Sequence, residues 1–375
     1  MEIRRETIKR VKRVVIKVGS AVLTLQSGGL NEEAFTRLSL AVSTLLAKGV
    51  EVAVVTSGAV AAGMGKLGLT ERPKSIPEKQ AAAAAGQSSL MGRYEKVFAA
   101  HNLNVAQVLL THEDLSSRHR YLNARNTLFT LLSYNVIPII NENDTVVVDE
   151  IKFGDNDNLS ALVAGLIDAD LLLILTDTDG LYDKDPRSHA DARLIPLVEK
   201  IDSHIEHMAG GVGTSIATGG MITKVQAARK ASSVGIPTII ASGSDMSNID
   251  RVFASEKVGT LFLSQSEKLT SRKHWIATVL KPKGAIIVDD GARDALISKG
   301  KSLLPTGIVG VEGDFGIGDA VLLEDKEGKK LAQGLAGYTH AEILLIMGHR
   351  SSRIEEILGY KYCDEVIHRD DLVIL

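Results

Sequence analysis

Short runs of β-branched and aliphatic residues alternate with longer stretches of helical periodicity up to about residue 265. Runs of this kind are typical of strands buried on both faces of a parallel sheet, with crossover helices between them. This rhythm predicts a three-layer αβα sandwich with a mainly parallel central sheet. The predicted strands are 13–18, 51–55, 104–110, 136–140, 171–175 and 236–241, and the predicted helices are 32–47, 78–100, 120–133, 157–168 and 223–233.

The pattern changes after about residue 270. From Pro282 onward, short apolar runs are separated by glycines at nearly even spacing. Evenly spaced short strands with turn signals indicate a small β-rich, barrel-like domain. We therefore expect an α/β domain over 1–270, a linker helix over 271–281, and a β-rich domain with a C-terminal tail over 282–375.

A lysine interrupts the first predicted strand. Lys17 lies between Ile16 and Val18, in a run that is otherwise suited to a buried strand. A buried ammonium group is costly without an anion. Lys17 therefore needs solvent at a sheet edge, a carboxylate from elsewhere in the fold, or a bound anion, and the strand alone favours the first two.

Two loops after strand ends are suited to anions. Ser57 and Gly58 follow the second strand and begin a helix, whose free N–H groups suit an anionic oxygen, although a serine there is also typical of an ordinary helix cap. In residues 218–224 (TGGMITK), two glycines allow close approach to a ligand, and Lys224 lies in the first helical turn. Because the helix dipole disfavours a cation at that end, a phosphate bound beside Lys224 is the better explanation.

Three further polar segments follow strands of the same predicted sheet, namely 141–146 (NENDTV), 153–164 (FGDNDNLSALVA) and 176–187 (TDTDGLYDKDPR). Each has an ordinary explanation as a helix cap or a solvated turn. Together with the two lysine-containing loops, they place carboxylates and lysines beyond strand ends, where ligands bind in α/β sheets. Such a site suits phosphoryl transfer, in which positioning and charge neutralisation provide most of the catalysis.

Two familiar nucleotide-binding motifs do not account for these loops. The sequence contains no G-x-x-x-x-G-K-[ST] segment. Residues 63–68 (GMGKLG) match G-x-G-x-x-G formally, but they lie well past the preceding strand and follow a segment that looks helical. The dinucleotide fingerprint requires its first glycine in the strand-to-helix turn, so we interpret this match as chance.

Composition narrows the class of protein. The chain has 375 residues, 45% of them hydrophobic, a net charge of −3 and one cysteine, Cys363. These values are typical of a globular protein with two domains and give no general attraction to nucleic acid or membranes. The single cysteine excludes an internal disulfide, the longest aliphatic run (171–175) is too short to span a bilayer, and the basic first residues lack the apolar stretch of a secretory signal. We expect a cytoplasmic protein.

The chain resembles the amino-acid kinase family in the order and spacing of its loop segments. These segments are IKVGS at 16–20, TSGAVAAG at 56–63 and the segments quoted above at 141–146, 153–164, 176–187 and 218–224. Within it they look like the glutamate 5-kinases, which 141–146 with 153–164 and the β-rich C-terminal segment separate from aspartokinase, N-acetylglutamate kinase and uridylate kinase. The resemblance covers essentially the whole chain, and 282–360 resembles a PUA domain. The implied fold is the αβα sandwich followed by a small PUA-like barrel.

The resemblance implies transfer of the γ-phosphoryl group of ATP to the side-chain carboxylate of L-glutamate, giving L-glutamyl 5-phosphate in the first step of proline biosynthesis. Lys17 and Lys224 would flank the phosphoryl group, and Asp157 would hold both lysines. The implied glutamate-binding residues are Ser57, Asp144 and Asn156, with Asp144 facing the α-ammonium group. The implied ATP-binding residues are Lys17, Thr176, Asp177, Thr218, Gly219, Gly220, Met221, Ile222, Thr223 and Lys224.

The family also implies further partners. Mg²⁺ would bridge the ATP phosphates with few or no direct protein ligands. Proline would act as a feedback inhibitor, the chain would form a homo-oligomer (a dimer or tetramer), and glutamate-5-semialdehyde dehydrogenase would consume the unstable acyl phosphate.

Two alternatives stay open. The acceptor could be N-acetylglutamate or UMP, although 141–146 offers little positive charge to a nucleotide, and N-acetylglutamate lacks the α-ammonium group that would face Asp144. The second alternative is an RNA-binding regulatory protein that acts through its PUA-like domain. Residues 282–360 contain 9 Lys and Arg against 12 Asp and Glu, whereas RNA-binding surfaces are normally basic. Nucleic acid is therefore not an expected partner.

Overall fold

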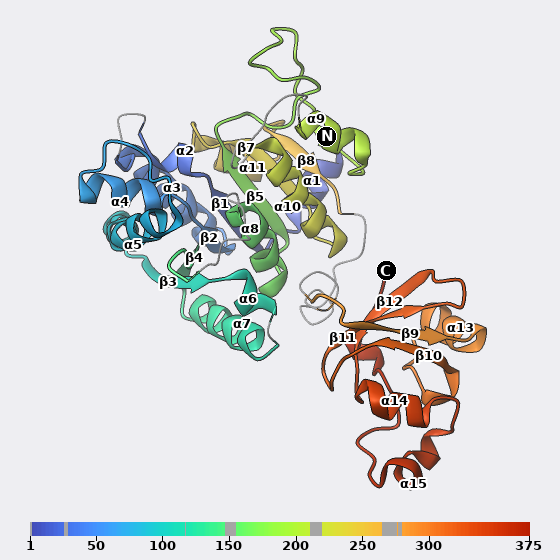
Figure 1. Cartoon of the computed structure of the whole chain (residues 1–375). Coiled ribbons are helices and arrows are strands. Elements are labelled where there is room, and N and C mark those ends of the chain that lie inside the picture. Colours follow the sequence, from blue (N-terminus) through green and yellow to red (C-terminus); the bar gives the residue numbers. More distant parts are fainter. Residues whose placement is uncertain are drawn as a thin grey trace. The chain divides into compact units, whose positions relative to one another are not determined.

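The computed structural model describes residues 2–25, 29–116, 118–146, 155–210, 220–264, 276 and 280–375. The chain divides into two compact units, Met1–Lys268 and Leu269–Leu375 (Figure 1). Most of the predicted linker helix, 271–281, lies outside the described residues. No helix in the described part of the chain has the length and apolar character needed to cross a membrane.

The first unit is built on a sheet that has eight strands among the described residues. They are β1 (Arg13–Val18), β2 (Glu51–Val55), β3 (Asn104–Leu110), β4 (Val136–Glu142), β5 (Leu171–Thr176), β6 (Leu197–Val198), β7 (Thr238–Ser242) and β8 (Thr260–Phe262). Their order is β3-β4-β2-β1-β5-β7-β8-β6, and neighbours are parallel except for β7 and β8. The six predicted strands are confirmed to within two residues at either end. The two short edge strands β6 and β8 were not predicted, because two or three residues carry no readable period.

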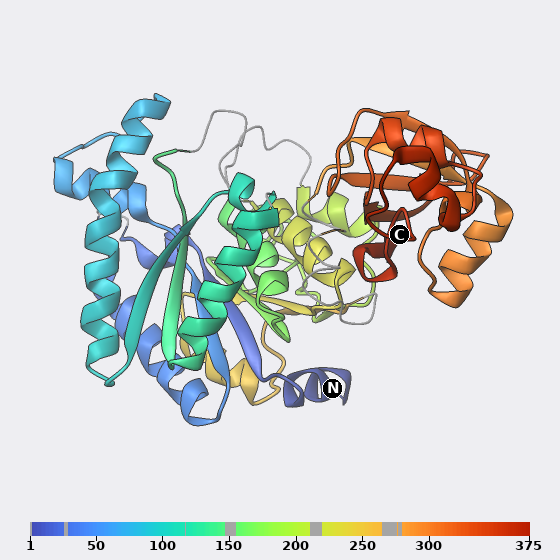
Figure 2. The same cartoon turned by 90° about the horizontal axis from the view of Figure 1, so that it is seen from below.

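Figure 2 shows helices on both sides of this sheet. The helices of the first unit are α1 (Glu2–Lys9), α2 (Ser20–Leu23), α3 (Glu32–Ala47), α4 (Ala59–Leu67), α5 (Ile76–Ala99), α6 (His112–Ser116), α7 (Arg118–Ser133), α8 (Asp155–Leu166), α9 (Ser203–Gly210), α10 (Met221–Ser233) and α11 (Ser247–Phe253). The predicted helices correspond to α3, α5, α7, α8 and α10. The αβα sandwich expected from the sequence is therefore the fold of this unit.

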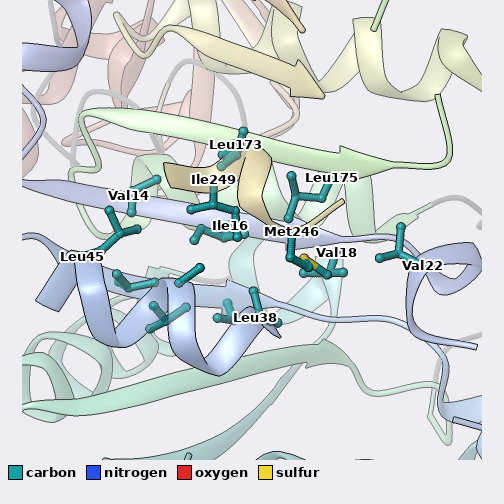
Figure 3. Close-up of a cluster of buried hydrophobic side chains, with 14 of the residues drawn as sticks. Val14, Ile16, Val18, Val22, Leu38, Leu45, Leu173, Leu175, Met246 and Ile249 are labelled. Carbon is teal, nitrogen blue, oxygen red and sulfur yellow. The ribbon is translucent and has the colours of Figure 1, made fainter. Parts of the chain in front are cut away.

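The main core lies on one face of the sheet. Val14, Ile16 and Val18 of β1 pack in one buried cluster with residues of α3 and α11, among them Leu38 and Ile249 (Figure 3). Because alternate residues of a strand point to opposite faces, Lys17 points to the other face. Helices α8 and α10 contact the sheet from that other face, and their buried residues lie outside this cluster.

Strand β1 lies between β2 and β5, and Lys17 pairs in register with Val55 of β2 and Ile174 of β5. The chain leaves β1 toward β2 on one side and returns much later as β5 on the other, so the strand order reverses at this point. In parallel α/β sheets, ligands bind outside the carboxyl ends of the strands at such a switch point. Ser57 and Thr176 lie at this edge because they end or follow β2 and β5.

The formal G-x-G-x-x-G match lies within and just after α4. Gly68 follows the helix with a left-handed backbone (φ +66°), which is typical of a helix C-terminus. A Cβ atom on Gly63 would lie 1.7 Å from the backbone oxygen of Ala82, and one on Gly86 would lie 1.9 Å from the backbone oxygen of Ala59. These glycines let α4 and α5 pack backbone against backbone, so the match has no nucleotide-binding geometry.

The second unit has its own sheet and core. Its strands are β9 (Gly284–Val288), β10 (Ile308–Gly313), β11 (Ala320–Glu324), β12 (Lys330–Leu335) and β13 (Leu372–Ile374), and its helices include α13 (Asp290–Lys299), α14 (His340–Ile346) and α15 (Ile354–Leu358). The strand order is β10-β9-β11-β12-β13, antiparallel except between β9 and β11. The amide of Gln333 donates hydrogen bonds to the carbonyl oxygens of Ile276 (2.6 Å) and Leu280 (3.0 Å), which ties the preceding segment to β12. The β-rich unit predicted from the glycine spacing is confirmed.

Candidate active site

Three charged side chains from three elements meet on the α8–α10 face of the sheet. Lys17 Nζ of β1 lies 2.5 Å from Asp157 Oδ1 of α8, and Lys224 Nζ of α10 lies 3.3 Å from Asp157 Oδ2. Their exposed fractions are only 6% for Lys17, 2% for Asp157 and 5% for Lys224, so water screens these charges little. Lys17 thus has a carboxylate from elsewhere in the fold, which is one of the ordinary explanations for a lysine in a buried strand.

The charges of this cluster do not cancel. Burial lowers the pKa of Lys17, and the Lys224 ammonium lowers it further, while Asp157 opposes both effects. Burial would raise the pKa of Asp157, but the two lysines and the hydroxyl of Thr223 outweigh it and hold that pKa below its usual value. One carboxylate thus faces two ammonium groups. The excess positive charge suits a phosphoryl group, whose oxygens carry negative charge.

The N-terminus of α10 lies beside the same carboxylate. The hydroxyl of Thr223 lies 2.6 Å from Asp157 Oδ2 and 2.8 Å from the carbonyl oxygen of Gly220, and it can donate to either. Gly220 precedes the helix and has no side chain that could cap it. The first N–H groups of a helix lack helical acceptors and attract anions. The described part of the predicted loop, from Gly220 onward, is therefore suited to an anion, and Thr218 and Gly219 lie outside the described residues.

A second group of residues forms a chain of side-chain amides at the carboxyl ends of β2 and β4. Asn156 Nδ2 donates to Ser57 Oγ (3.3 Å) and to Asn141 Oδ1 (3.1 Å), and Asn141 Nδ2 donates to Gln87 Oε1 (2.9 Å). Ser57 does not cap α4, since Gly58 is the residue before that helix. Asn156 adjoins Asp157 in α8, so this amide chain is directly next to the charged cluster.

The remaining predicted residues lie at the same edge of the sheet. Asp144 follows β4 and is half-buried, and burial raises the pKa of its carboxyl group to about 6. Thr176 is buried at the end of β5, where its hydroxyl donates to Asp177 Oδ1 (3.0 Å). Asp177 is exposed, and Met221 and Ile222 are half-buried in the first turn of α10. Among the described residues, Asp144 makes no hydrogen bond to the amide chain.

Sequence reasoning did not assign Gln87 or Asn141. Asn141 lies within the polar segment 141–146, but nothing in that segment distinguishes it from its neighbours. Gln87 lies in the middle of α5, four residues after Ala83 and three before Leu90, and both of these are buried. A polar side chain at helical spacing within an apolar stripe is the signal that could have identified Gln87.

Comparison with known proteins agrees with this geometry. The model of the "Amino acid kinase family" matches residues 12–242, which is more than half of the chain. The chain belongs to the amino acid kinase family. The matched residues run from β1 to the end of β7 and contain every residue of the charged cluster and of the amide chain. A "PUA domain" model matches residues 284–358, from the start of β9 to the end of α15.

Proteins that are similar to this chain include two that are named glutamate 5-kinase. The protein of Geobacter sulfurreducens is 56% identical over 368 residues, covering 98% of this chain and 99% of its own length. The protein of Pelobacter propionicus is 55% identical over 372 residues, covering 99% of this chain and all of its own length. The similarity therefore includes both structural units.

Proposed function

We propose that this chain is an ATP-dependent glutamate 5-kinase that phosphorylates the side-chain carboxylate of L-glutamate to give L-glutamyl 5-phosphate, the first step of proline biosynthesis. The observation that carries the proposal is the buried Lys17–Asp157–Lys224 cluster directly beside the amide chain of Ser57 and Asn156. It combines a site for a transferring phosphoryl group with a site for a small polar acceptor. Relatives named glutamate 5-kinase support the choice of acceptor, because they match both units at high identity.

The charged cluster stabilises the transferring group. An oxygen of the glutamate side chain attacks the γ-phosphorus of ATP and forms a new P–O bond, while the bond to the bridging oxygen breaks and ADP leaves. Lys17 and Lys224 neutralise charge on the phosphoryl oxygens, since both ammonium groups are held at one carboxylate and are almost fully buried. Asp157 positions the lysines and is no base, because the attacking carboxylate is already ionised and has no proton to lose.

The amide chain and Asp144 hold the acceptor. Ser57 and Asn156 bind glutamate next to the cluster, and the Asp144 carboxylate faces its α-ammonium group. The raised pKa of Asp144 supports this role. Burial is its cause, no charged partner faces Asp144 among the described residues, and a bound ammonium group would relieve the shift. The alternative acceptor N-acetylglutamate would leave Asp144 without such a partner.

ATP binds at the carboxyl end of β5 and at the N-terminus of α10. Thr176 and Asp177 contribute from the end of β5, and residues 218–224 contribute from the loop and first turn of α10. Among the described residues, no group of three or more His, Cys, Asp or Glu side chains is arranged to hold a metal ion, and Asp157 is already paired with two lysines. Mg²⁺ would enter with the ATP phosphates and would supply further charge neutralisation there.

Regulation and partners follow the family. We propose feedback inhibition by proline, a homo-oligomer of two or four chains, and a functional link with glutamate-5-semialdehyde dehydrogenase, which consumes the acyl phosphate. Because ATP and glutamate are both cytoplasmic metabolites, we also propose a cytoplasmic location.

The direct test is acyl-phosphate formation trapped as the hydroxamate. The purified protein is assayed with ATP and L-glutamate, N-acetyl-L-glutamate or L-aspartate, and release of ADP is followed with UMP. We expect turnover with L-glutamate and a decrease when proline is added. Turnover with another acceptor in place of L-glutamate would contradict the proposed substrate and leave the fold assignment intact.

A further inference from the structure

The amide chain has an unpaired atom at each end. Asn156 Oδ1 and Gln87 Nε2 are both buried and, among the described residues, neither has a hydrogen-bond partner. The direction of the hydrogen bonds determines which atoms these are. Asn156 donates to the oxygen of Asn141, and Asn141 donates to the oxygen of Gln87. One end therefore presents an acceptor and the other end presents a donor.

Leaving such atoms unpaired is unfavourable, and proteins rarely do so without a reason. An α-amino acid carries a donor, its ammonium group, and an acceptor, its carboxylate, on the same carbon. The two open atoms of the chain match that pair of groups in kind. Asn156 Oδ1 suits the ammonium group, which Asp144 also attracts, and Gln87 Nε2 suits the carboxylate.

Backbone packing holds Gln87 in place. Gly86 lies against α4 so closely that a Cβ atom there would lie 1.9 Å from the backbone oxygen of Ala59. Ala59 is the first residue of α4 and comes two residues after Ser57. The contact therefore joins the turn of α5 that carries Gln87 to the start of the helix beside Ser57. The contact fixes the backbone of this turn, and the hydrogen bond from Asn141 Nδ2 to Gln87 Oε1 orients the side-chain amide. A donor oriented in this way needs little reorganisation when a ligand binds.

We propose that Gln87 is a substrate-binding residue that donates a hydrogen bond from Nε2 to the α-carboxylate of the acceptor amino acid. This inference rests on the proposed function and deepens it, because it names the group that recognises the α-carboxylate. Gln87 has two separable roles in this arrangement. Its oxygen accepts from Asn141, and its nitrogen binds the substrate.

Substitutions at Gln87 separate the two roles. Gln87→Met keeps the length of the side chain and removes both hydrogen bonds, whereas Gln87→Glu keeps an oxygen that can accept from Asn141 and replaces the donor with an acceptor. The exposed neighbour Ser88 provides the matched control, Ser88→Ala. For each protein, KM for L-glutamate, KM for ATP, kcat and the melting temperature are measured. The inhibition constant of 4-aminobutyrate, which lacks the α-carboxylate, is measured as well.

We expect Gln87→Met to raise KM for L-glutamate by about 10- to 100-fold, the usual effect of losing a hydrogen bond to a charged group. KM for ATP should stay within about twofold of the wild-type value. Gln87→Glu should be at least as impaired, because it places a carboxylate against the substrate carboxylate. Inhibition by 4-aminobutyrate should change little, since this analogue has no group for Gln87 to bind, and Ser88→Ala should behave as the wild type does.

A near-wild-type KM in Gln87→Glu combined with a raised KM in Gln87→Met would overturn the proposal, because Gln87 would then act only by positioning Asn141. An unchanged KM in both variants would overturn it as well. If the wild-type protein turns over an acceptor without an α-carboxylate and does not turn over L-glutamate, both this inference and the proposed function fail. If the wild-type protein turns over L-glutamate and the Gln87 variants have an unchanged KM for it, the inference about Gln87 is wrong and the proposed function stands.

Discussion

Lys224 is the residue at which the charge of the active site can be tested most directly. Replacing it with methionine removes one ammonium group and keeps most of the side-chain volume, and Asp157 remains paired with Lys17. Because we propose that this charge acts on the transferring phosphoryl group, we expect Lys224→Met to lower kcat by about 100-fold or more with a smaller effect on KM for glutamate. Steady-state kinetics beside Lys48→Met, a substitution of an exposed lysine, would check this. A raised KM with normal kcat would contradict the assigned role.

Asp144 predicts how acceptor binding depends on pH. Its pKa is raised to about 6, so the carboxyl group is neutral below that pH and ionised above it. An α-ammonium group binds the ionised form, and we therefore expect KM for L-glutamate to rise as the pH falls through 6, by up to about tenfold per pH unit. In Asp144→Asn, KM should be high and nearly independent of pH between 5 and 8. A wild-type KM that stays constant over this range would contradict the assignment.

At the scale of elements, the α4–α5 pair is held by two glycines. A Cβ atom on Gly63 would lie 1.7 Å from the backbone oxygen of Ala82, so Gly63→Ala must push the helices apart. We expect a loss of stability of about 1–3 kcal/mol, seen as a lower melting temperature. Gly65 of the same helix has nothing within 4 Å of a Cβ atom, so Gly65→Ala should be neutral or slightly stabilising. Equal melting temperatures for both variants would show that the contact is not close in solution.

Helix α8 was predicted correctly from the sequence, but its own residues did not show which partners its polar side chains contact. The segment with Asp155, Asn156, Asp157 and Asn158 begins a helix, as expected. In isolation it has more capping residues than one helix needs. Only the neighbouring elements in the fold show that Asp157 forms ion pairs with two lysines and that Asn156 donates a hydrogen bond to Ser57.

At the scale of the whole molecule, the PUA match raises the question of RNA binding. Residues 282–360 carry an excess of acidic over basic residues, and electrostatic attraction to phosphates dominates RNA affinity. We therefore expect no strong binding of tRNA to the full chain in filter-binding assays at low salt. Tight binding whose affinity falls steeply as salt is added would contradict this prediction and revive the regulatory alternative.

The sequence by itself determined the order and type of the principal elements, the change of architecture after about residue 270, and the loops that carry the proposed site. Hydrophobic periodicity and glycine spacing are local properties, so they can be read without knowing the fold. Strands β1 to β5 and β7 were predicted correctly for this reason. The short strands β6 and β8 were not, because their pairing depends on neighbours distant in the chain.

The tertiary structure alone decided which polar residues meet. Lys17, Asp157 and Lys224 come from three elements far apart in the sequence, and only the parallel pairing of β1 with β5 and the placement of α8 and α10 on one face bring them together. The same holds for Gln87, which accepts a hydrogen bond from Asn141 because α5 packs beside the end of β4. A side chain's partners depend on distances through space, and these are set by the packing of the whole sheet.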